Sequence, residues 1–140
     1  MPVVTDIADA VVDALNGYSF SETFTAVRSF RPRYDLTELA TLRVTVVPKS
    51  RTQEQLTRTS NREDIEIDVG IQKQVSTDDG AVEDLMELAD EIVDFMDRNE
   101  VGGAKWMGMT NDPIYDPTYL TEKNVFFTVL TFKMMLVRTP

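Results

Sequence analysis

The sequence predicts an α+β fold in which two amphipathic helices pack on a mainly antiparallel β-sheet. Three observations support this expectation. Apolar residues recur at helical spacing in residues 7–15 and again in residues 82–96. Segments 42–47 and 64–71 alternate as half-buried strands do, and segment 125–137 is apolar on both faces. Helices and strands in this order are typical of one layered domain.

The first helix is predicted from a short apolar stripe. Its members follow the spacing i, i+3, i+4, i+7, i+8, and they are Ile7, Ala10, Val11, Ala14 and Leu15. Thr5 is the expected N-cap, and Asn16-Gly17 is the expected stop. A strand is expected to follow within Thr23–Tyr34, ending near Pro32 because proline cannot donate to a sheet ladder.

The connection between the next two strands is the most unusual local feature. Leu42–Val47 and Asp64–Ile71 are separated by the polar segment Pro48–Glu63, in which Leu56 is the only large apolar residue. Hairpin connections usually contain about two to five residues. We therefore expect a long β-hairpin loop that is mobile in the free subunit and ordered in an assembly.

The second helix is predicted from a longer apolar stripe, whose members are Val82, Leu85, Met86, Ala89, Ile92, Val93 and Met96. Thr77–Asp79 offers its N-cap, and Gly102-Gly103 lies beyond its end. A strand at Ala104–Met109, a turn-rich stretch and a final strand at Val125–Val137 are expected to follow. The second face of that final strand needs cover, either from a partner subunit or from the loop Met109–Glu122.

Composition excludes several classes of function. The formal net charge of −10 repels phosphate backbones, so we expect no general or sequence-specific nucleic-acid binding. The absence of cysteine and histidine excludes disulfides, thiolate chemistry and histidine-based catalysis. The acidic start predicts no signal peptide, and no apolar run approaches the roughly 18 residues of a membrane span. Without a repeat or linker, a single domain over residues 1–140 is expected.

Charge is distributed unevenly along the chain. The segment Asp78–Glu100 is rich in acids and has one base, Arg98. The segment Lys49–Arg62 has the opposite balance, with Glu54 as its only acid. Basic side chains concentrated in one segment of an acidic protein indicate a surface for another subunit. The candidate assembly interface consists of Lys49, Arg51, Arg58, Arg62, Phe127, Val129 and Lys133.

No catalytic constellation or common nucleotide-binding motif is found, so we expect no enzyme, no cofactor and no metal. Three groups of residues have both a chemical and a structural interpretation: Asp64, Glu66 and Asp68; Arg28, Arg31 and Arg33; and Trp106, Met107 and Met109. The carboxylates could bind a hard cation, the arginines an anion and the aromatic group a ligand. A solvated strand face is the preferred interpretation for the first, and packing in the core or an interface for the third. Ion pairs with acidic helices explain the arginines as well.

The order and character of these elements resemble the tail terminator, or tail-completion, proteins of tailed bacteriophages and their neighbours at the head–tail neck. The resemblance spans nearly the whole chain. It rests on a helix ending near Asn16-Gly17, strands around Arg28–Phe30 and Leu42–Val47, the long polar hairpin loop, the strand Asp64–Ile71, the helix Val82–Met96 and a closing strand ending in Lys133–Arg138.

This resemblance implies a structural virion protein without catalytic residues. Its implied assembly is a ring of identical subunits, typically a hexamer, that caps the tail tube and joins it to the head. The implied partners are the chain itself, the tail tube protein and a head-proximal neck or connector protein, in a virion assembled in the host cytoplasm. A basic segment of one subunit would meet a neighbour's acidic surface. The alternatives are another neck or head-closure connector, or a small non-catalytic ligand-binding or regulatory domain.

Overall fold

The computed structural model describes residues 3–30, 41–75, 79–98, 103–111, 114–115 and 117–138. The described elements are, in chain order, α1 (Val3–Asn16), β1 (Ala26–Arg28), β2 (Arg43–Gln55), β3 (Asn61–Gln74), α2 (Asp79–Arg98), β4 (Lys105–Thr110), α3 (Pro117–Lys123) and β5 (Val125–Arg138). The five strands form one sheet in the order β1-β2-β3-β5-β4, in which only β1 and β2 are parallel. This arrangement confirms the predicted α+β class with a mostly antiparallel sheet.

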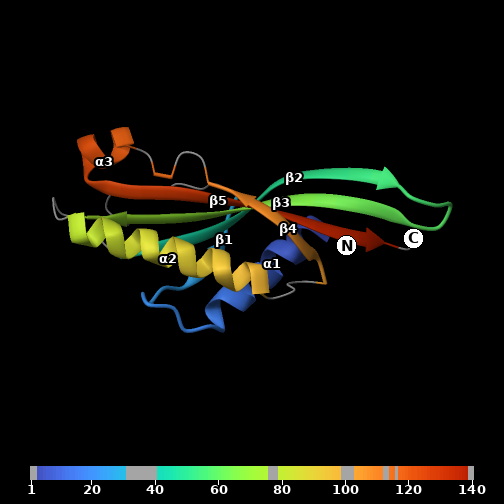
Figure 1. The fold of residues 1–140 in the computed structure, drawn as a ribbon, viewed down its shortest axis with the longest axis horizontal. Helices are drawn as coiled ribbons and strands as arrows, with labels where there is room; N and C mark the ends of the chain where they lie inside the picture. The colour runs from blue at the N-terminus through green and yellow to red at the C-terminus, as the bar shows by residue number, and fades with distance from the viewer. Residues whose placement is uncertain are drawn as a thin grey trace.

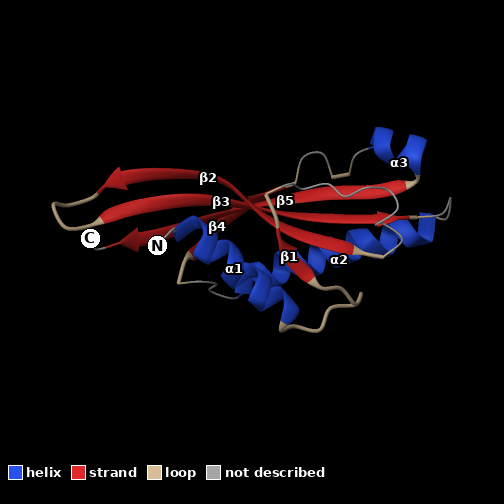
Figure 2. Ribbon diagram, turned by 180° about the vertical axis from the view of Figure 1, so that it is seen from behind, coloured by secondary structure: helices blue, strands red, loops and turns tan. Residues whose placement is uncertain are grey.

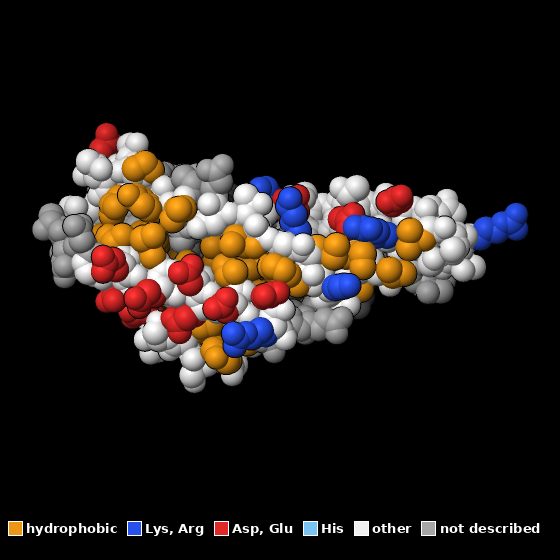
Figure 3. Space-filling view, in the orientation of Figure 1, with side chains coloured by type: hydrophobic (Ala, Val, Ile, Leu, Met, Phe, Trp, Pro, Cys, Tyr) orange, Lys and Arg blue, Asp and Glu red, His pale blue; other side chains and the backbone are white. Residues whose placement is uncertain are grey.

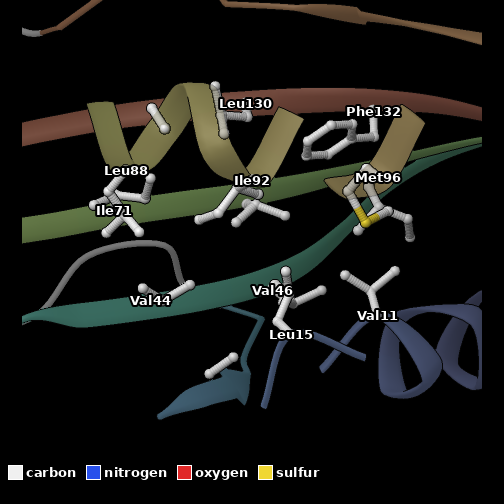
Figure 4. Close-up of a cluster of buried hydrophobic side chains, with 14 of the residues drawn as sticks. Val11, Leu15, Val44, Val46, Ile71, Leu88, Ile92, Met96, Leu130 and Phe132 are labelled. Atoms are coloured by element: carbon white, nitrogen blue, oxygen red, sulfur yellow. The ribbon is translucent and has the colours of Figure 1, made fainter. Parts of the chain in front are cut away.

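The two main helices pack on the same face of the sheet (Figure 1). α1 contacts β1 and β2, whereas α2 contacts β4 and β5. In the core between them, α2 presents Leu88, Ile92 and Met96 toward the strands (Figure 4). Leu88 is fully buried although the predicted stripe omits it. Burial of this continuous stripe explains why α2 folds here despite its many acidic residues.

The predicted boundaries of α1 are half right. The helix begins at Val3, so the expected N-cap at Thr5 is wrong. It ends at Asn16 as predicted, where the Gly17 amide donates to the Asp13 carbonyl at 3.0 Å. The Asn16 side chain then binds the backbone of Ala26 in both directions, at 2.7 and 3.1 Å. This pair of hydrogen bonds fixes the short strand β1 against the end of the helix. Residues 31–40, which contain the rest of the expected Thr23–Tyr34 strand, lie outside the described residues.

The expected long β-hairpin loop is wrong. β2 continues to Gln55 and β3 starts at Asn61, so only residues 56–60 connect them. The ladder is interrupted once, by a register shift between Pro48 and Ser50. Proline has no amide hydrogen to donate, and a bulge on a strand edge is where a ladder tolerates it. We call residues 50–66, the part of the hairpin beyond this bulge, the arm.

The arm projects beyond the helices, alongside the last residues of β5 (Figure 2). Residues 51–55 of β2 are all exposed, which explains their polar sequence. On β3, Ile65 remains buried near the base of the arm. The polar composition of this segment therefore reflects a solvated β-ribbon, not an irregular loop.

The final strand has the predicted extent, and its second face is covered only in part. Val125 and Phe127 are buried, Val129 and Met135 are half-buried, and Val137 is exposed. At the start of the strand lies α3, a short helix that the sequence reading missed and that contacts β5. Asn124 ends α3 with a positive φ of 54°, a conformation that asparagine tolerates better than most residues.

Candidate assembly surfaces

The arm carries the most protruding of the predicted interface residues. Arg58 lies in the five-residue turn at its tip, and Arg51 lies on the exposed part of β2. The turn is held by hydrogen bonds from the Leu56 and Thr57 amides to the Ser60 carbonyl, at 3.0 and 3.2 Å. The Thr57 and Ser60 hydroxyls also lie 2.8 Å apart. The tip is thus a defined structure that presents Leu56, 49% exposed, together with Arg58.

A second set of the predicted residues gathers on the face of the sheet without α1 and α2. Lys49 from β2 and Val129 and Lys133 from β5 line one hollow with Glu66 and Asp68. Pairing across β3 and β5 explains this arrangement, because Glu66 is opposite Lys133. The Lys49 ammonium lies 4.0 Å from the Glu66 carboxylate. The charges of the hollow offset one another, so this region is much less basic than its lysines alone suggest.

The three carboxylates weighed as a cation site each have a separate partner. Arg62 binds Asp64 at 3.1 Å, Lys49 lies near Glu66, and the Thr131 hydroxyl donates to Asp68 at 2.6 Å. Within the described ranges, no group of three or more acidic side chains lies close enough together to hold a metal ion. The predicted solvated strand face describes these residues better.

Phe127 does not belong to the surface of the subunit. Its side chain is only 7% exposed, whereas Val129 and Lys133 are increasingly exposed along the same face. Alternation along β5 correctly places the three residues on one side of the sheet. It could not show that this side is covered at the start of the strand and open toward its end.

The acidic side of α2 forms a continuous outer surface. Its exposed carboxylates are Glu83, Asp84, Glu87, Asp90, Asp94 and Asp97. Figure 3 shows acidic side chains gathered over this helix, with a basic side chain at the far end of the arm. None of these acids forms an ion pair with any described base. The molecule therefore has a negative surface on α2 and one basic side chain, Arg58, in the tip of an arm whose other bases are offset by Glu54, Glu63, Asp64 and Glu66.

Beside α2 lies an aromatic cluster that the sequence reading missed. The ring of Tyr18 is 4.7 Å from that of Phe20 and 4.8 Å from that of Phe95. Ser21 donates through both its amide and its hydroxyl to the Glu91 carboxylate, which fixes this segment to the helix. Tyr18 nevertheless remains 54% exposed. The density of aromatics in residues 18–24 was a usable signal, but their contact with Phe95 is made only by the fold.

This cluster borders a hollow of about 410 Å³. The hollow is lined by Tyr18, Glu91, Asp94, Phe95 and Arg98. It combines an exposed aromatic ring with carboxylates, the two kinds of group that attract a guanidinium.

The other groups singled out in the sequence have structural partners. Arg28 forms an ion pair with Asp9 at 2.7 Å and lies 5.0 Å from the centre of the Phe30 ring. Arg31 and Arg33 lie outside the described residues. Trp106 packs against the core, and Met107 is exposed at a bulge in β4.

No helix in the described part of the chain is long and apolar enough to cross a membrane. Comparison with models of known protein families finds no match to this chain, and comparison with curated proteins finds none either.

Proposed function

We propose that this chain is a structural subunit that assembles into a ring and acts as a tail terminator, capping a bacteriophage tail tube and joining it to the head. The observation that carries the proposal is the pairing of two unlike surfaces on one molecule. A protruding arm with exposed bases extends from a body whose outer helix is strongly acidic (Figure 3). The order of elements expected for a terminator supports the more specific assignment.

The β2 half of the arm is largely exposed in the single subunit. Residues 51–55 are exposed, and beyond Val46 no described segment pairs with the outer edge of β2. Within the arm β3 lies between β2 and β5, so β2 is the strand with an unpaired edge, and an open strand edge readily pairs with another chain. A neighbouring subunit supplies both the burial and the missing hydrogen bonds.

Two different contact surfaces on one subunit favour a head-to-tail contact. Such a heterologous contact generates a closed ring when its rotation closes. The positive charge of Arg58 at the tip and the negative charges of α2 speed association and select the correct orientation. The head-proximal partner and the tail tube would then bind the two faces of the ring.

The test is the mass of the purified chain as a function of salt. Raising the NaCl concentration from about 0.05 M to about 0.5 M shortens the Debye length about threefold and so weakens interactions between exposed charges. Analytical ultracentrifugation measures the mass at both concentrations. We expect a closed oligomer at low salt, partial dissociation at high salt, and retention of the oligomer on purified tail tubes. A monomer under every condition, with no binding to tubes, would refute the proposal.

A further inference from the structure

Building on the proposed ring, we propose that the tip of one subunit's arm docks in the hollow beside α2 of the next copy. Arg58 binds Asp94 and the face of Tyr18 there. Three features carry this assignment: the chemistry of the tip, the chemistry of the hollow, and a geometry that keeps the two apart within one subunit.

The tip presents a cation beside an apolar side chain. Leu56 and Arg58 both lie in the turn, which is held by hydrogen bonds among Leu56, Thr57 and Ser60. No ion pair between Arg58 and any described acid is formed. A preorganised turn loses less conformational entropy on docking than a mobile loop would.

The hollow offers matching groups. Asp94 is exposed and forms no ion pair with the neighbouring Arg98. Glu91 is already engaged by Ser21, which leaves Asp94 as the available carboxylate of the lining. Tyr18 supplies an exposed ring for cation–π contact and for packing of Leu56. Nearby Asp90 and Asp97 keep the potential negative despite Arg98.

The contact is made between copies because the arm points away from the hollow of its own subunit. Figure 1 shows the hairpin tip at one end of the long axis, well beyond the C-terminal end of α2. The tip of one copy therefore contacts a different surface of the next copy. A contact of this head-to-tail kind can repeat around a ring.

Charge exchange tests the assignment. We expect Arg58→Glu and Asp94→Arg each to weaken self-association about tenfold or more, and the double variant to recover most of that loss. Lys123→Glu and Glu122→Arg on α3 make the same charge changes on exposed residues away from the contact and from the acidic surface of α2. These controls should assemble like the unmodified chain, and circular dichroism should show unchanged secondary structure for all variants.

The outcomes separate the two proposals. If the unmodified chain never self-associates, ring formation and the docking contact both fail. If it assembles but Arg58→Glu and Asp94→Arg assemble equally well, or the double variant is no better than either, the docking contact is wrong and the ring proposal stands. A photo-crosslinker in place of Leu56 gives an independent readout. Intermolecular crosslinks to residues 18–24 or 91–98 are expected, and crosslinks confined elsewhere would overturn the contact.

Discussion

Replacing Ile92 by alanine tests how α2 is seated on the sheet. Ile92 is fully buried at the centre of the helix, facing the strands (Figure 4). The change removes three carbon groups, a transfer loss of about 2.4 kcal/mol at about 0.8 kcal/mol each. A residual cavity of about 40 Å³ adds about 1 kcal/mol. The better helix propensity of alanine offsets about 0.4 kcal/mol of this loss in stability. The expected loss in the free energy of unfolding is therefore about 3 kcal/mol.

Urea unfolding measures this loss directly. The midpoint should fall while the slope stays constant, because the same surface is exposed on unfolding. Glu87→Ala on the outer side of the same helix is the matched control, and it should cost about 0.5 kcal/mol or less. Equal costs for the two variants would mean that the helix presents the opposite side to the sheet.

Three further predictions concern the end of α1 and the arm. Asn16→Ala removes both hydrogen bonds to the Ala26 backbone and should cost about 1–3 kcal/mol in a chemical unfolding experiment; a neutral effect would mean that water replaces the amide fully. The triple change Arg51→Glu, Arg58→Glu and Arg62→Glu should leave cooperative unfolding intact and abolish ring formation, since these charges lie outside the core; normal assembly would assign the arm no such role. In hydrogen exchange, the paired strand amides of the arm should exchange more slowly than its tip, whereas uniform fast exchange would mean that the ribbon is not formed.

The elements that bury one apolar face could be predicted from the sequence, and the exposed hairpin strands could not. Val82–Met96 and Asp64–Ile71 have apolar residues at the period of their structure, because each buries one side. The outer half of β2 is exposed on both faces, so its sequence has no such period and resembles a loop. Pro48 also favoured the wrong prediction of a loop, because a proline often marks the end of a strand. Here it lies at a bulge within β2.

Part of the candidate surface also depended on information that only the fold supplies. The four bases Lys49, Arg51, Arg58 and Arg62 were visible as a cluster in the sequence. Their separation into a protruding arm and a charge-balanced hollow follows from where the strands bend and pair. The contact of Tyr18 with Phe95 joins residues far apart in the chain, and no periodicity predicts it.

Electron microscopy of the chain assembled at low salt tests the central claim most directly. The account predicts closed rings of identical subunits in which each arm crosses to the acidic helix of its neighbour, and it predicts that the Arg58→Glu variant yields few or none. Isolated monomers, or symmetric pairs in which the arms contact each other and the acidic helices stay free, would contradict it.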